Sequence, residues 1–215
     1  MVFDFQTVER KLNSYTREWR TIQSGSLKTV NSILGLISKL NLVKNKQFYE
    51  ALDFPDLENR MVLALIDQIN LKIPNMIKAT GAFRNLLEKM TNWAAVYNRL
   101  ITSEIRNLVD SNRLQELDSS QKDEIESKIR IREQTLDHIL EITKMFETEV
   151  QLRIRLIELL QKSTNQLNAQ LISFYLTIWA SEPYIDFNRI LEILESFQSL
   201  DFVSQSANQS ADIRN

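Results

Sequence analysis

The sequence predicts an all-α protein: an elongated antiparallel bundle of four or five helices of the coiled-coil type, with a short cap helix near the C-terminus. Gly and Pro, the residues that most often interrupt helices, occur only three times each in 215 residues. Apolar residues recur at spacings of three and four along most of the chain. One such segment, residues 121–168, is long enough for about 70 Å of helix, a length typical of coiled-coil bundles.

The first helical segment covers residues 4–44. Ser24, Gly25 and Ser26 interrupt its apolar pattern, so we expect either one broken helix or two stacked helices. The stripe that we expect to be buried consists of Phe5, Val8, Leu12, Tyr15, Trp19 and Ile22 before the interruption, and of Leu27, Val30, Ile33, Leu34, Ile37 and Leu40 after it.

A break at residues 45–56 separates this segment from the next. Phe54 precedes a proline and is therefore biased towards an extended conformation, while Pro55 suits the first position of a helix. Pro74 interrupts the following stripe, which it either kinks or divides into two helices. That stripe consists of Leu57, Met61, Leu65, Ile69, Ile73, Ile77, Leu86 or Leu87, Met90, Trp93, Tyr97, Leu100, Ile101, Ile105 and Leu108.

A polar, turn-rich stretch at residues 110–121 precedes the long helix. Its stripe consists of Ile125, Ile129, Leu136, Ile139 or Leu140, Thr143, Phe146, Val150, Ile154, Ile157, Leu160 and Leu167. The chain then contains an uncharged run, residues 169–180, a turn at Pro183, and a cap helix with Phe187, Ile190, Leu191, Leu194 and Phe197 inside. We therefore predict a single bundle domain over residues 1–200. The polar tail, residues 201–215, is too poor in apolar residues to order itself.

Composition excludes several classes of function. The absence of cysteine excludes a disulfide framework, a thiolate nucleophile and Cys-based zinc sites. A net charge of −2 gives no electrostatic basis for direct binding to nucleic acid. The longest uncharged run, about 12 residues, falls short of the roughly 20 that a membrane span requires. The N-terminus lacks the basic and apolar regions of a signal peptide.

No set of residues resembles a catalytic site. His138 is the only histidine, and the residue three positions before it is Thr135, which excludes the paired Glu-x-x-His motifs of di-iron bundles. Three glycines are too few for a nucleophile elbow, a P-loop or a dinucleotide turn. Glu147 and Glu149 point to different faces of a helix and so cannot share a substrate. We expect a protein that is not an enzyme and that needs no cofactor or metal.

Two groups of residues admit both a structural and a binding role. Arg153 and Arg155 flank Ile154 in an apolar stretch, either as solvated side chains whose stems cover apolar neighbours or as ion-pair partners of another helix. Trp19, Trp93 and Trp179 lie on helical stripes, where burial in the core is the usual outcome. Tyr175, Trp179 and Tyr184 beside Pro183 form an aromatic turn that either closes the bundle end or contacts a partner.

Several motifs resemble the cyclin-dependent-kinase-interacting protein family. Met145-Phe146, Glu149 and Leu152-Arg153, followed by Tyr175-Leu176, Trp179 and Pro183-Tyr184-Ile185, are similar to the C-terminal half of that family. Trp19 and the apolar pattern after it resemble its N-terminal helix. Phe54-Pro55-Asp56-Leu57 is more similar to a sister family, a ribosome-maturation cofactor of the same build. The chain contains no Ser-Pro or Thr-Pro, so a proline-directed kinase finds no ordinary target in it.

The resemblance implies a non-enzymatic, all-helical adaptor in nucleus and cytoplasm. It would pair with a similar helical protein, as a homodimer or heterodimer. It would associate with a type II AAA ATPase in maturation of the large ribosomal subunit and in chromatin-linked protein turnover. The candidate partner-binding residues are Tyr175, Trp179, Pro183, Tyr184, Arg153 and Phe54. The alternatives are a structural coiled-coil subunit of a tethering or kinetochore-type assembly, and a protein that binds membrane surfaces through residues 169–180.

Overall fold

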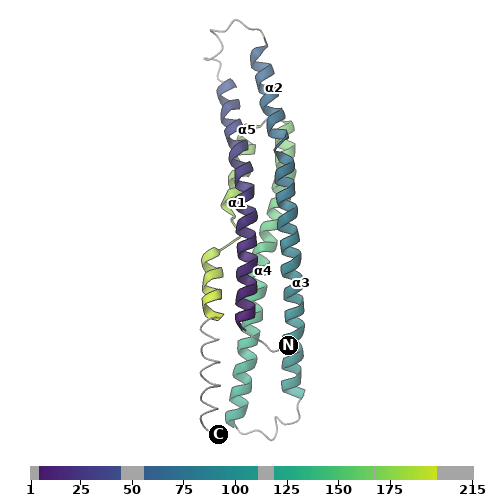
Figure 1. The fold of residues 1–215 in the computed structure, drawn as a ribbon, viewed down its shortest axis with the longest axis vertical. Helices are drawn as coiled ribbons and strands as arrows, with labels where there is room; N and C mark the ends of the chain where they lie inside the picture. The colour runs from purple at the N-terminus through teal and green to yellow at the C-terminus, as the bar shows by residue number, and fades with distance from the viewer. Residues whose placement is uncertain (1–4, 45–55, 111–118, 167, 198–215) are drawn as a thin grey trace. The chain divides into compact units, whose positions relative to one another are not determined.

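The computed structural model describes residues 5–44, 56–110, 119–166 and 168–197. These residues confirm the predicted all-α helical bundle, and they contain no strand (Figure 1). A further helical stretch covers residues 187–197, where the cap helix was predicted. The labelled helices are α1 (Phe5–Lys44), α2 (Leu57–Asn70), α3 (Ile73–Asp110), α4 (Ser119–Asn165) and α5 (Ala169–Ser181).

Helix α1 is continuous through the Ser-Gly-Ser stretch, so neither a broken helix nor two stacked helices is found. Ser26 is buried there, and its hydroxyl donates to the Gln23 carbonyl oxygen at 2.9 Å. A buried serine that finds acceptors on its own helix does not interrupt it. Of the three residues of this stretch, Ser26 faces the core, while Ser24 and Gly25 are exposed.

Pro74 lies at the start of α3 and divides the helical segment instead of kinking it. Helix α2 ends at Asn70, and Leu71 and Lys72 form a turn before α3 begins at Ile73. This position suits proline because the first residues of a helix need no N–H partner. The new start also shifts the buried face: Met76 is fully buried, and Ile77, which the continuous pattern placed inside, is 44% exposed.

The chain groups into two compact units through which α1, α3 and α4 run. Unit 1 comprises residues 1–17, 86–147 and 186–215, and unit 2 comprises residues 18–85 and 148–185. The predicted single domain over residues 1–200 stays a prediction. Phe54, Pro55 and the tail, residues 201–215, lie outside the described residues.

Unit 1 packs around aromatic and aliphatic side chains of α1, α3, α4 and the 187–197 helix. The Tyr15 hydroxyl donates to the Lys89 carbonyl oxygen at 3.3 Å, and the Tyr15 ring meets the edge of Trp93. His138 lies against the Phe197 ring and 3.6 Å from the Glu141 carboxylate, so the only histidine contributes to packing. The buried core of this unit includes Val8, Leu12, Met90, Ile101, Ile139, Ile142, Phe146 and Ile190.

An ion pair joins the 187–197 helix to α4 within unit 1. The Arg189 guanidinium donates to both oxygens of Glu141, at 2.8 and 3.0 Å. Two parallel bonds of this kind fix the orientation of the pair, although its partial exposure limits its effect on stability. The contact places the cap helix where the apolar pattern predicted it, with Leu194 and Phe197 buried and Leu191 49% exposed.

Unit 2 contains the second half of α1, all of α2 and α5, the start of α3 and the end of α4. Helices α1 and α5 are antiparallel, since Trp19 contacts Glu182 and Ser26 contacts Trp179. Asn168 caps α5 by accepting the Leu171 N–H at 3.1 Å. Among the described residues, no helix is both long and apolar enough to cross a membrane.

Candidate functional site: a buried arginine beneath an exposed turn

The centre of unit 2 is a charged side chain. Arg153 of α4 is fully buried, although the sequence interpretation left it either as a solvated side chain or as the ion-pair partner of another helix. Its neighbour Arg155 is solvated, and its guanidinium pairs with the exposed Glu158 carboxylate at 2.8 Å. Arg153 extends the apolar stripe of Phe146, Val150, Ile157 and Leu160, and for that reason it points inward while Ile154 is only half-buried.

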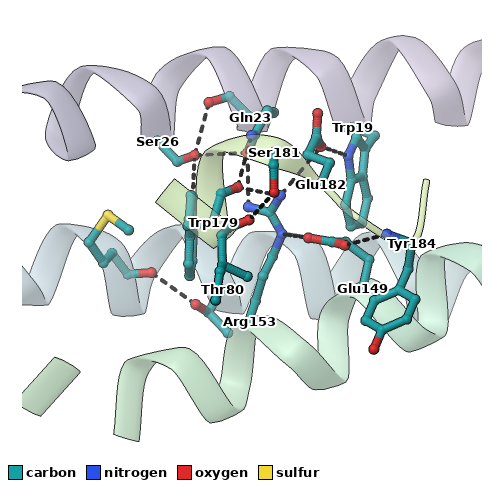
Figure 2. A network of polar contacts seen from close by, with 12 residues as sticks. Trp19, Gln23, Ser26, Thr80, Glu149, Arg153, Trp179, Ser181, Glu182 and Tyr184 are labelled. Atoms are coloured by element: carbon teal, nitrogen blue, oxygen red, sulfur yellow. Dashed lines mark hydrogen bonds and ion pairs between the residues drawn. The ribbon is translucent and has the colours of Figure 1, made fainter. Parts of the chain in front are cut away.

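The Arg153 guanidinium makes four hydrogen bonds (Figure 2). Its Nε donates to Glu149 Oε1 at 3.1 Å, and its Nη1 donates to Gln23 Oε1 at 2.8 Å. Its Nη2 donates to the Trp179 carbonyl oxygen at 3.4 Å and to Glu182 Oε1 at 3.3 Å. Arginine suits this position because its flat, forked group can bind acceptors from several helices at once.

Three aromatic rings enclose the same guanidinium. Its carbon lies 4.2 Å from the centre of the Phe83 ring, 4.6 Å from Trp179 and 5.4 Å from Trp19. A cation against aromatic faces is attracted by the ring electrons, and the attraction increases when water is excluded. The rings come from three helices, so the cation links α1, α3 and α5 to α4.

Polar groups of α1 complete the arrangement. The Trp19 Nε1 donates to Glu182 Oε1 at 2.6 Å, and the Gln23 Nε2 donates to the Trp179 carbonyl oxygen at 3.3 Å. The Trp179 Nε1 donates to the Ser26 hydroxyl at 3.0 Å. We call Trp19, Gln23, Ser26, Glu149, Arg153, Trp179 and Glu182 together the arginine node.

The arginine node holds the turn that follows α5. Glu182, the residue after the helix, has a φ of 47°, a left-handed conformation that is uncommon for residues other than glycine and costs on the order of 1 kcal/mol or more. Its carboxylate contacts to Trp19 and Arg153 offset that cost. The Tyr184 N–H donates to Glu149 Oε2 at 3.3 Å, which fixes the next part of the turn.

The turn presents residues to solvent while its ends are buried. Tyr184 is 50% exposed, Pro183 is also exposed, and Ile185 is buried. Figure 2 shows the Tyr184 ring at the edge of the node. Tyr175 is half-buried on α5 and lies against Phe174.

The structure thus separates the six candidate partner-binding residues. Trp179 and Arg153 are fully buried, so their part in binding can only be indirect, through the shape of the turn. Tyr184, Pro183 and Tyr175 keep surface for a partner, and their role stays a prediction. Phe54 lies outside the described residues.

Charge in the arginine node is unbalanced when all its groups are ionised: one guanidinium faces two carboxylates. Burial raises the pKa of Glu149 above its ordinary value, although Arg153 and the Tyr184 N–H oppose the rise. Burial also raises the pKa of Glu182, against its bonds from Trp19 and Arg153. Burial lowers the pKa of Arg153, which still remains charged because its ordinary value is so high.

The raised pKa of Glu149 predicts a distinctive pH dependence. A carboxyl group that binds its proton more tightly in the folded state adds stability at low pH, and that stability is lost as the pH rises through the folded pKa. The free energy of unfolding of the wild type, relative to Glu149→Gln, should therefore fall as the pH rises above 4.5, the ordinary pKa of a glutamate. Urea denaturation at a series of pH values measures it.

Glu147→Gln is the matched control for this pH series, because Glu147 lies on the same turn of α4 and pairs with Lys144 at the surface. If the wild type instead becomes more stable relative to Glu149→Gln as the pH rises, the pKa of Glu149 is not raised in the folded protein.

Comparison of the chain with protein-family models, with curated proteins and with solved structures gives no match. The functional interpretation therefore depends on the site itself. Within the described residues, no group of three or more His, Cys, Asp and Glu side chains is placed to hold a metal ion. The Glu149 and Glu182 carboxylates face Arg153 inside the node. The exposed side chain on the turn that the node holds is Tyr184.

Proposed function

We propose that this chain is a non-enzymatic adaptor that docks a partner protein through Pro183 and Tyr184, on a turn held in shape by the arginine node. The observation that carries the proposal is that Tyr184 is anchored and exposed at once. Its N–H is bonded to buried Glu149, and half of the residue is open to solvent. A turn whose backbone is held in this way loses little backbone freedom on binding, and tyrosine is frequent among the residues that dominate interfaces.

The nature of the partner comes from the resemblance of the motifs in residues 145–185 to the cyclin-dependent-kinase-interacting protein family and its sister. On that basis we propose a type II AAA ATPase as the docked partner and a similar helical protein as a second one. The ATPase complex would act in large ribosomal subunit maturation and chromatin-linked proteostasis, in nucleus and cytoplasm. Glu149, Arg153, Trp179, Pro183 and Tyr184 belong to the resembling motifs, and the node and its turn unite these five positions.

Tyr184→Ala tests the proposal without disturbing the core. We expect the variant to keep its melting temperature, because the removed ring is half-exposed, and to lose at least about tenfold in affinity for the ATPase. Affinity purification of tagged protein from cells, followed by mass spectrometry, measures the recovery of the ATPase and of pre-ribosomal proteins.

Leu191→Ala is the control, since Leu191 is equally exposed and belongs to unit 1. Equal recovery of the ATPase with Tyr184→Ala and with the wild type would contradict docking at the turn. Recovery of cytoskeletal or tethering subunits in place of the ATPase would favour the structural coiled-coil alternative.

A further inference from the structure

The arginine node contains one more carboxylate than its cation can balance. Glu149 and Arg153 lie one turn apart on α4 and form an ion pair at 3.1 Å, with both side chains fully buried. The second carboxylate, Glu182, lies on the turn after α5. Its Oε1 is 3.3 Å from Arg153 Nη2, and 14% of its side chain is exposed. The pair on α4 is thus balanced by itself, and the turn brings the surplus negative charge.

Every element packed around the two carboxylates contributes to their surroundings. The groups around them and their cation are Trp19 Nε1, the Gln23 amide and the Ser26 hydroxyl from α1, the Phe83 ring from α3, Arg153 from α4 and the Tyr184 N–H from the turn. The charge of Arg20 on α1 also acts on Glu182, but the Arg20 side chain is exposed, and solvent weakens its field. Arg153 is therefore the buried counter-charge that both carboxylates share.

The closed turn is held by three bonds and opposed by two costs. Glu182 accepts from Trp19 and from Arg153, and the Tyr184 N–H donates to Glu149. Against these bonds, the φ of 47° at Glu182 is a strained backbone conformation. Burial raises the pKa of both carboxyl groups, and the charge of Glu182 raises that of Glu149 further. Ionisation of both groups therefore disfavours the closed turn.

A proton on either carboxyl group removes the surplus charge, because one guanidinium then faces one carboxylate. When that proton leaves to water, the surplus returns. Opening of the turn then transfers Glu182 to water and leaves the balanced pair of Glu149 and Arg153 behind. We propose that the turn after α5 is a proton-dependent switch, closed while Glu149 and Glu182 together hold one proton and open more often once that proton has left. As a means of regulating partner docking, this switch rests on the adaptor function proposed above.

Hydrogen exchange of the Tyr184 amide tests the switch without a partner, because this N–H is bonded to Glu149 in the closed turn. NMR measures its protection factor, the intrinsic exchange rate divided by the observed rate at the same pH. In the wild type the factor should fall by about three- to tenfold per pH unit as the pH rises above 4.5, since release of one proton changes an equilibrium by at most about tenfold per unit. In Glu182→Gln, which lacks the surplus charge, the factor should not change with pH.

A second variant and an internal control make the exchange experiment specific. Glu149→Gln also leaves one carboxylate for one guanidinium, so the factor of Tyr184 should again be independent of pH. The Arg189 N–H, which donates to the exposed Asp186 carboxylate at 2.9 Å, should keep a constant factor in all three proteins. A wild-type factor for Tyr184 that stays constant or rises with pH overturns the proposal, and so does a fall of equal size in Glu182→Gln.

Recovery of the ATPase from cell lysates adjusted to the same pH values separates the switch from the adaptor proposal. With tagged wild type the recovery should fall as the pH rises, and with Glu182→Gln it should stay constant. A pH-dependent protection factor without recovery of the ATPase at any pH would support the switch and contradict docking at the turn. Equal recovery at every pH would support docking and contradict its regulation by the switch.

Discussion

Replacement of Arg153 by alanine should reduce the free energy of unfolding by about 3–5 kcal/mol. Removing the cation leaves Glu149 fully buried without its counter-charge and close to the Glu182 carboxylate, and breaking a buried pair in this way costs about that much. It also removes the group between the rings of Trp19, Phe83 and Trp179. Urea denaturation followed by circular dichroism at 222 nm measures the loss.

Three further variants make the Arg153 experiment specific. Arg155→Ala removes the neighbouring arginine, which is exposed, and should change the free energy of unfolding by no more than about 0.5 kcal/mol. Arg153→Lys keeps the charge and loses the fork, so it should recover only part of the stability. Arg153→Met with Glu149→Gln removes cation and carboxylate together, and should be less harmful than Arg153→Ala. A loss below about 1 kcal/mol in Arg153→Ala would contradict a central role for the cation.

Replacement of Trp179 by alanine should cost a similar amount, about 3–5 kcal/mol. The side chain is fully buried, it packs against Phe83 at a ring distance of 6.4 Å, and its N–H donates to Ser26. Truncating a large buried aromatic side chain leaves a cavity that the surroundings fill only in part. Thermal and urea denaturation measure the loss.

Trp179→Phe separates the two contributions of this side chain. Phenylalanine keeps most of the apolar contact but leaves the Ser26 hydroxyl without its donor, so we expect a smaller loss of about 1–3 kcal/mol. Leu191→Ala, at a half-exposed position, should stay close to the wild type. A stable Trp179→Ala protein with weakened partner binding would place this residue at an interface instead of in the core.

Apolar spacing predicted that most of the chain is helical, because a helix in a bundle buries one face whatever lies opposite it. Spacing did not show that α1 is continuous or that the chain divides between α2 and α3. The spacing failed where polar residues occupy that face. Gln23 and Arg153 are buried where the neighbouring Ile22 and Ile154 were expected, since each polar group finds its partners on another helix. The spacing did contain one signal that Arg153 is buried: it lies seven residues after Phe146 and seven before Leu160, on the same face of the helix.

The contacts of the arginine node could not be predicted from one sequence. Glu182, Gln23 and Arg153 are far apart in the chain, and no local pattern pairs them. The exposure of Ile77 had a local cause instead, the restart of the helix at Ile73. The sequence did predict that residues 175–185 are unusual, although it could not divide them into a buried anchor and an exposed turn.

The long sequence separations within the node have a consequence for synthesis of the chain on the ribosome. Trp19 and its acceptor Glu182 are 163 residues apart, and Gln23 and Arg153 are 130 apart. In the nascent chain, Trp19 of α1 therefore cannot reach its acceptor until Glu182 has been synthesised. Such non-local closure slows folding and leaves apolar surface open to chaperones in the meantime. A chain that ends before Trp179 would lack the Trp179 carbonyl oxygen and the Glu182 carboxylate, which accept from α1 and from Arg153 in the node.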